Sequence, residues 1–207
     1  MIQKFEKRFK EDLFEKLLKI KNEELFSFLS FYLELLNPKE VYLVSEEKDF
    51  DYIRKKAIET GEEILTAIPG HTIHFDSYYD QARDKKNTKI LLSKEENLSE
   101  EIVTASQKEG LEEIHTLLKD IMRNRKLYII FYLLGPKSSP YAIPAVQLTD
   151  SSYVCHCENL LYRLGYESFL NLKDNRFFKF IHSQGELDER KTCKILINEE
   201  YISTEII

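Results

Sequence analysis

Residues 126–165 read KLYIIFYLLGPKSSPYAIPAVQLTDSSYVCHCENLLYRLG. The run from Leu127 to Leu134 is apolar, rich in β-branched and aromatic residues, and ended by Gly135-Pro136. A short run of this composition that stops at a turn signal predicts a buried strand. The loop that follows is held between two prolines, and a second apolar run, Ala142 to Leu148, predicts the next strand.

The second half of this stretch predicts a helix. Side-chain oxygens at residues 149–152 are able to cap a helix, and Tyr153 to Leu164 has helical spacing up to Gly165, which we expect to stop it. The stretch therefore predicts two strands joined by a rigid loop and followed by a capped helix. This arrangement places the loop at the end of a sheet.

The flanking sequence predicts helices before this platform and further strands on both sides of it. The charged N-terminal segment is amphipathic, with one apolar stripe formed by Phe5, Phe9, Leu13, Leu17 and Ile20. We expect one domain over 1–207, with a helical part at 1–37 and a mixed-sheet part at 38–207, in the α+β class. The expected elements are two helices over 3–37 separated by a cap at Asn22, a strand at 41–44, a helix at 49–60, an irregular segment at 62–87 with a turn at Pro69-Gly70, a strand at 88–92, a helix over 101–124 in one piece or broken near Gly110, and strands at 177–182, 192–197 and 201–207.

Composition and charge exclude several classes of function. The chain has 207 residues, 43% hydrophobic content and a formal net charge of −6, which argues against nucleic acid or an anionic membrane surface as a general partner. No apolar run approaches the roughly 18 residues of a membrane span, and the N-terminus lacks the apolar core of a signal peptide. Three cysteines without a secretory signal fit the reducing cytoplasm.

Two histidine-containing segments invite a metal interpretation, and neither supports it well. Cys155 and Cys157 flank His156, but side chains two positions apart on a helix point about 200° apart and would not converge. His71 and His74, followed by Asp76, are interpreted as part of a solvated loop. The sequence contains neither a GxxxxGK[ST] phosphate loop nor an HExxH motif, so we expect no metal site and no catalytic residue in this chain.

Several spaced positions match a known pattern in order, and the match over residues 125–165 needs no gap. They are Arg125, Tyr128, Gly135-Pro136, Ser139-Pro140, Leu148-Thr149-Asp150-Ser151, Tyr153-Val154, Arg163-Leu164-Gly165 and, further on, Ile181-His182-Ser183-Gln184-Gly185. Together they resemble the GP-x-GSP, ELTDSPYVV, RMG and LHSVG segments of the GTP-dependent phosphoenolpyruvate carboxykinases. The departures are Ser138 for glycine, Gln147 for glutamate and Ser152 for proline, as expected of a divergent member.

The resemblance implies a role for one arginine. Asp80-Gln81-Ala82-Arg83 is similar to the family's DVAR, with Thr88 at the matching distance, and the family arginine binds the carboxylate of oxaloacetate or phosphoenolpyruvate. Arg83 inherits that substrate-binding role by resemblance, and a planar guanidinium suits a carboxylate bidentately. From residue types alone, a surface ion pair with Asp80 or Asp84 is the alternative. The loop of Gly135, Pro136, Ser139 and Pro140 is expected to help form an interdomain wall, and His182 to make a structural hydrogen bond.

The family enzymes are much longer than this chain, and their phosphate loop, manganese ligands and guanine pocket lie in the C-terminal part. The match ends at Glu205-Ile206-Ile207, just before the family's glycine-rich segment. We therefore expect the N-terminal, substrate-side domain, inert by itself, with a C-terminal catalytic domain as partner and GTP and manganese or magnesium bound by the complete enzyme. The alternative is a non-catalytic domain of this fold that binds an anion or a protein, or that binds no ligand.

Overall fold

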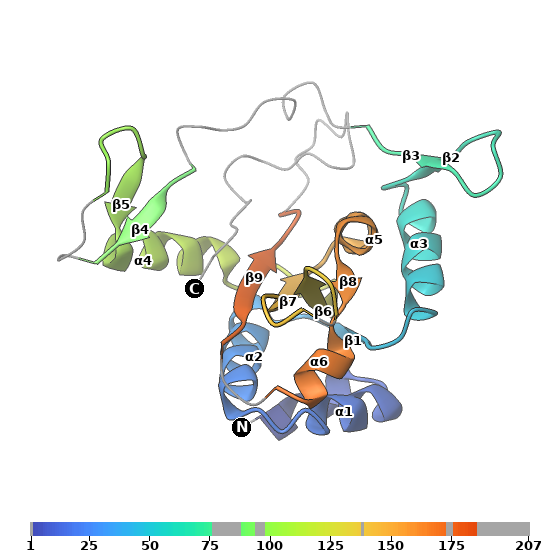
Figure 1. Ribbon diagram of the computed structural model, residues 1–207, viewed down its shortest axis with the longest axis horizontal. Coiled ribbons are helices and arrows are strands. Elements are labelled where there is room, and N and C mark those ends of the chain that lie inside the picture. Colours follow the sequence, from blue (N-terminus) through green and yellow to red (C-terminus); the bar gives the residue numbers. More distant parts are fainter. Residues whose placement is uncertain (1, 76–87, 94–97, 138, 173–175, 186–207) are drawn as a thin grey trace.

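The computed structural model describes residues 2–75, 88–93, 98–137, 139–172 and 176–185, and these residues build a mixed sheet with helices on both faces (Figure 1). The sheet has five strands in the order β1-β6-β7-β9, with the short β8 paired to β6. β1 is parallel to β6, β6 is antiparallel to β7 and β8, and β7 is parallel to β9. This arrangement confirms the predicted α+β class. The strands are β1 (Glu40–Val44), β6 (Lys126–Leu134), β7 (Ile143–Thr149), β8 (Arg163–Leu164) and β9 (Phe178–His182).

The central strand β6 is buried on both faces, as its continuous apolar run predicts. Successive side chains of a strand point to opposite faces, and here they enter two separate apolar clusters. Leu127, Ile129 and Phe131 belong to the larger cluster, and Tyr128 and Ile130 belong to the smaller one. The two layers of helices are therefore organised around this one strand.

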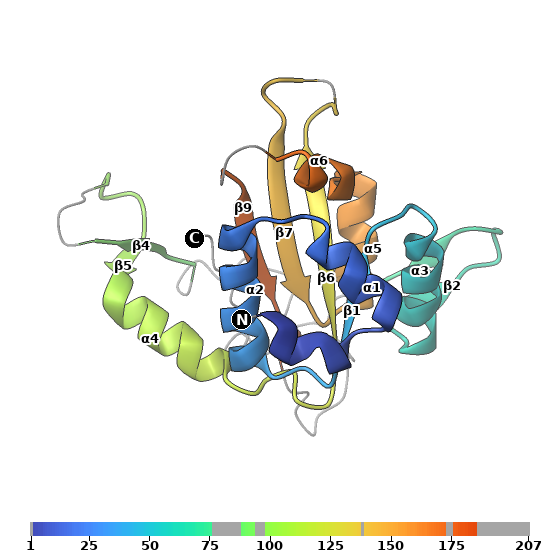
Figure 2. The same ribbon diagram turned by 90° about the horizontal axis from the view of Figure 1, so that it is seen from below.

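The N-terminal helices cover the face of the larger cluster, and they lie in front of the sheet in Figure 2. The whole apolar stripe expected from the sequence is buried there. The Asn22 cap is confirmed, because its side-chain oxygen accepts a hydrogen bond from the Leu25 N–H at 2.8 Å. The single helix expected before Asn22 is wrong, because Phe9 forms a β-bridge with Val41 and interrupts it. The elements are the 3-10 helix η1 (Ile2–Arg8), α1 (Glu11–Leu18) and α2 (Glu23–Leu36).

Helices α3 (Asp49–Glu59) and α5 (Ser152–Leu161) pack against each other, and side chains from both enter the smaller cluster. α5 is shorter than predicted, because Arg163–Leu164 leaves the helix and pairs with β6 as β8. Gly165 is not a helix stop. A Cβ built at Gly165 would lie 2.6 Å from the backbone carbonyl of Tyr132, so only glycine fits where the chain crosses β6 so closely.

Helix α6 (Tyr166–Leu170) packs on β6 and places Phe169 in the larger cluster, whereas the other remaining elements lie at the periphery (Figure 1). The segment expected to be irregular contains a small hairpin, β2 (Ile64–Leu65) with β3 (Thr72–Ile73), around the expected turn at Gly70. The helix expected over 101–124 is confirmed only over Gln107–Leu118, where it runs in one piece through Gly110. Its expected ends are wrong, because residues 104–106 pair with a strand and residues 119–124 form turns. The strands expected at 192–197 and 201–207 lie outside the described residues. The other elements are β4 (Ile90–Leu92), β5 (Thr104–Ser106) and α4 (Gln107–Leu118).

Candidate functional site

A buried polar network forms where β6 begins and where β7 and β9 end, and its centre is the carboxylate of Asp150. One Asp150 oxygen accepts hydrogen bonds from the Arg125 guanidinium at 2.7 Å and from the Ser183 hydroxyl at 2.9 Å. The other oxygen accepts the Gln184 backbone N–H at 2.9 Å, and the Arg125 guanidinium also donates to the Gly185 carbonyl. The Asp150 side chain is 0% exposed. We call Arg125, Asp150, Ser183 and Gln184 the Asp150 network, and it ties three strand ends together.

His182 lies beside this network and plays the structural role expected from the sequence. Its Nδ1 lies 2.9 Å from the Thr149 hydroxyl, and the Ser151 backbone N–H donates to the same hydroxyl oxygen at 3.1 Å. The hydroxyl can therefore donate its own proton to a neutral His182. Burial lowers the pKa of His182 because it disfavours the charged ring, and nearby Asp150 partly offsets this effect. The residue is held as a neutral hydrogen-bond acceptor.

The N-terminus of α5 is capped by Ser151, within the segment predicted to supply the cap. The Ser151 Oγ accepts the Val154 N–H at 3.1 Å and donates to the Glu62 carboxylate at 2.8 Å. Glu62 also accepts the Ser152 hydroxyl at 3.2 Å and the Tyr153 N–H at 2.6 Å. Helix N-termini favour negative charge, and here the chain supplies that charge itself.

Two of the three histidines considered as metal ligands, His74 and His156, contact other groups of the protein. His156 lies 2.6 Å from the Glu63 carboxylate, whose side chain is 2% exposed. The His74 ring stacks on Tyr153 with ring centroids 3.6 Å apart, and its Nδ1 donates to the Glu62 carbonyl at 2.7 Å. Burial raises the pKa of the Cys155 thiol, so the reactive thiolate is disfavoured. Among the described residues, no group of three or more histidine, cysteine or carboxylate side chains could hold a metal ion.

The residues predicted for the substrate side fall in different places. Arg83 and Asp76 lie outside the described residues. The Gly135–Pro140 loop joins β6 to β7, and Gly135 has φ +106°, a conformation that favours glycine. Within the loop, the Ser139 N–H donates to the Pro136 carbonyl at 2.9 Å. This loop lies at the C-terminal end of β6, whereas the Asp150 network lies at the N-terminal end of that strand. At about 3.3 Å per residue, the nine residues of β6 separate them by roughly 25–30 Å.

Sequence reasoning missed the two glutamates that fix α5. Glu62 and Glu63 contact residues 89 to 93 positions further along the chain, and no local sequence pattern predicts such a contact. Arg125, Asp150 and Ser183 were visible only as separate motif positions. The fold brings these positions together, and it leaves the loop after β6 at the other end of the sheet.

The sequence model of the phosphoenolpyruvate carboxykinase N-terminal domain matches residues 27–204, which include every described strand of the sheet. The chain belongs to this family. The expected resemblance is thereby confirmed, and the matched region contains all the motif positions that meet in the Asp150 network. The family match also accounts for the mixed sheet with helices on both faces.

Relatives from several archaea are named phosphoenolpyruvate carboxykinase [GTP]. The protein from Thermococcus sibiricus is 53% identical over 91% of this chain, that from Pyrococcus furiosus is 50% identical over 94%, and that from Saccharolobus solfataricus is 46% identical over 87%. The chain covers only 30%, 31% and 29% of these relatives, so it corresponds to about a third of their length. In the described part of the chain, every helix is too short or too polar to cross a membrane.

Proposed function

We propose that this carboxykinase-family chain is the substrate-side domain of an enzyme that converts oxaloacetate and GTP to phosphoenolpyruvate, GDP and carbon dioxide. The bond from C3 of oxaloacetate to the carboxylate next to it breaks, which releases carbon dioxide and leaves the enolate of pyruvate with its one remaining carboxylate. The enolate oxygen then takes the γ-phosphoryl group of GTP, and GDP leaves. The support is the family match over 27–204 together with relatives of that name at about half identity. We further propose that this enzyme acts in gluconeogenesis in the cytoplasm.

In this proposal, Arg83 binds the substrate carboxylate. Its guanidinium stays charged and offers paired donors that match the two carboxylate oxygens. The Gly135–Pro140 loop would form part of the wall against a C-terminal catalytic domain. The Asp150 network would serve the reaction indirectly, by holding the strand ends of the domain in one arrangement while substrate and partner domain bind.

The nucleotide and the metal ions belong to the rest of the enzyme in this proposal. The described residues supply no group of side chains suited to manganese or magnesium, and the sequence has no phosphate loop of the GxxxxGK[ST] type. When bound, the metal would neutralise charge on the transferring phosphoryl group. We therefore expect the 207-residue chain alone to be inert, and we derive no chemical step from it.

The test is the kinetic effect of Arg83→Ala in the full-length enzyme. Losing a charge-assisted bidentate contact should lower kcat/KM for oxaloacetate by roughly one to two orders of magnitude. KM for GTP should hardly change, and Arg83→Lys should restore only part of the loss, because a point charge does not reproduce the planar fork.

Arg123→Ala is the matched control, because Arg123 is largely exposed and pairs only with Asp120, at 2.9 Å, among the ion pairs of the described residues. It should leave kcat/KM near the wild-type value. Unchanged oxaloacetate kinetics in Arg83→Ala would remove the substrate role of Arg83. Absence of oxaloacetate-dependent GDP formation in the wild-type enzyme would instead favour a non-catalytic domain.

A further inference from the structure

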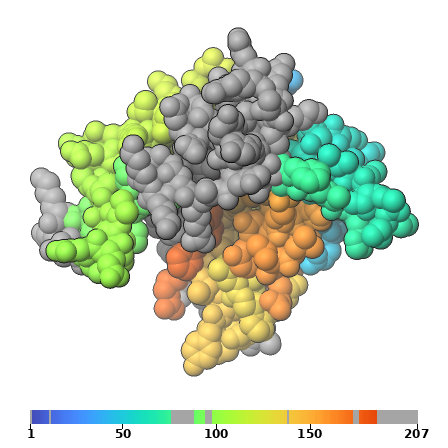
Figure 3. All heavy atoms as spheres, turned by 90° about the horizontal axis from the view of Figure 1, so that it is seen from above, coloured from blue at the N-terminus to red at the C-terminus, as the bar shows by residue number. Residues whose placement is uncertain are grey.

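A pocket of about 550 Å³ lies at the end of the sheet opposite the Asp150 network. It is an open pocket bordered by the start of the β6–β7 loop, the C-terminal end of α5 with β8, and the turn that follows β1. The loop and α5 adjoin on the surface in the space-filling view (Figure 3). The lining residues are Glu47, Pro136, Lys137, Asn159, Tyr162, Arg163 and Leu164.

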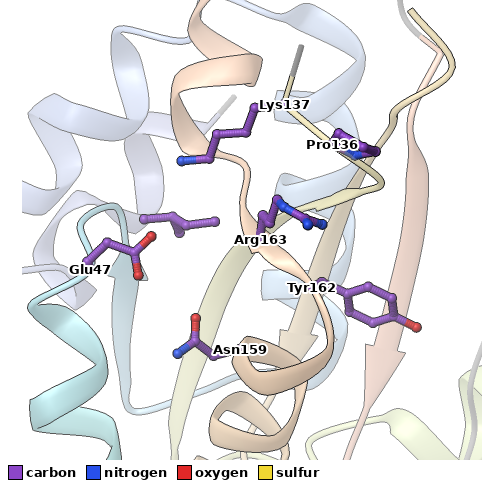
Figure 4. A pocket seen from close by; sticks show the side chains of 7 residues that line it. Glu47, Pro136, Lys137, Asn159, Tyr162 and Arg163 are labelled. Carbon is purple, nitrogen blue, oxygen red and sulfur yellow. The ribbon is translucent and has the colours of Figure 1, made fainter. Parts of the chain in front are cut away.

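Three polar side chains point into the same space of this pocket (Figure 4). These are the Lys137 ammonium, the Glu47 carboxylate and the Asn159 amide, and the buried Leu164 also lines the pocket. Neither Lys137 nor Glu47 forms an ion pair with another residue in the described part of the chain. The pocket therefore offers one cation, one anion and one amide around an apolar floor.

The other charged side chains near the pocket contact groups outside it or point away from it. The Arg163 guanidinium donates to the Gly135 carbonyl at 3.2 Å and points toward Pro136 (Figure 4). Glu46 pairs with the ammonium groups of Lys16 and Lys48, the latter at 2.7 Å. The balance of charge inside the pocket is thus set by Lys137 and Glu47.

This pattern of charge selects against simple ions. A carboxylate or phosphate would meet the Glu47 carboxylate, and a simple amine would meet the Lys137 ammonium, since like charges repel. A molecule that carries both charges on a short skeleton satisfies both groups. Asn159 can donate to one end of such a molecule and accept from the other.

We propose that this pocket binds a free α-amino acid. Its carboxylate contacts Lys137, its ammonium contacts Glu47, and its side chain lies on Leu164. The volume leaves room for a medium-sized side chain and several waters. This site goes beyond the proposed carboxykinase function. It shares Pro136 and Lys137 with the loop proposed as the wall against a C-terminal domain, so its test uses the 207-residue chain alone.

The test compares three probes of similar shape that differ only in charge. L-Leucine carries both charges, 2-hydroxy-4-methylpentanoate lacks the ammonium, and 3-methylbutylamine lacks the carboxylate. Each is titrated into the isotope-labelled 207-residue chain, and the amide resonances of Asn159 and Leu164 are followed by NMR. We expect saturable shifts with leucine at millimolar concentrations, and binding about fivefold weaker or worse for both analogues, because each exposed charge contact contributes modestly.

Variants of Lys137 and Glu47 test which charge of leucine each side chain contacts. Lys137→Gln should weaken leucine binding about fivefold, whereas Glu47→Gln should weaken leucine and strengthen the hydroxy acid, because it removes the repulsion. Both positions are exposed, so both variants should fold. Lys48→Gln is the matched control, since this neighbouring lysine pairs with Glu46, and it should leave binding unchanged. Absence of a saturable shift with leucine, or hydroxy acid binding as tight as leucine binding, would overturn the proposal.

Discussion

Replacing Asp150 by asparagine should destabilise the domain strongly, because its fully buried carboxylate is the centre of the network. The carboxylate accepts three hydrogen bonds, from Arg125 at 2.7 Å, from Ser183 at 2.9 Å and from the Gln184 N–H at 2.9 Å. An asparagine amide keeps one oxygen and replaces the other with an NH₂ group. Whichever way it turns, at least one donor then faces another donor, and Arg125 loses its counter-charge.

The expected cost follows from the burial of the two partners. Removing one partner of a fully buried ion pair costs about 3–5 kcal/mol. The Arg125 side chain is 28% exposed, so water partly screens it and the estimate falls to about 2–4 kcal/mol. For a chain of this length, about 2–4 °C of Tm accompanies each kcal/mol, which gives a decrease of roughly 5–15 °C.

Urea denaturation of the wild type and Asp150→Asn measures this free energy, with circular dichroism and fluorescence as independent probes of two-state unfolding. Glu34→Gln is the control, because Glu34 pairs with Lys4 on the surface and its side chain is 70% exposed. It should change stability by less than about 1 kcal/mol. A double-mutant cycle with Arg125→Gln should give a coupling energy above about 1 kcal/mol. A cost for Asp150→Asn no larger than that of the control would refute the reasoning.

Three further predictions concern the scaffold. Gly165→Ala should destabilise the chain by roughly 1–3 kcal/mol in urea melts, because its Cβ would overlap the Tyr132 backbone; an unchanged midpoint would show that the crossing can widen. Asn22→Ala should cost about 1 kcal/mol through loss of the cap, and Asn22→Ser should recover most of it. His182 has a lowered pKa in the fold, so the unfolded chain binds its proton first. Its contribution to stability is complete above about pH 6.5 and is lost as the pH falls below that value. The stability difference between wild type and His182→Gln should therefore shrink or reverse at acidic pH, and a constant difference between pH 5 and 8 would contradict this assignment.

Much of the architecture could be predicted from local pattern. The apolar run of β6, the cap at Asn22 and the cap at Ser151 each depend on residues close in sequence, and each is found where expected. The errors occurred where a distant pairing overrode local spacing. Residues 163–164 continue a helical pattern but gain backbone hydrogen bonds by pairing with β6, and residues 104–106 pair with β4 for the same reason.

The sequence by itself determined the class of the fold, the two central strands with the loop between them, and the motif positions that identify the family. These depend on periodicity, turn chemistry and residue identity, which are properties of neighbours along the chain. Only the tertiary structure decided that Asp150 joins Arg125 to Ser183, that Glu62 supplies the charge at α5, and that the β6–β7 loop lies at the opposite end of the sheet. Such contacts join residues 25 to 89 positions apart, and their energies exist only once folding has removed the groups from water.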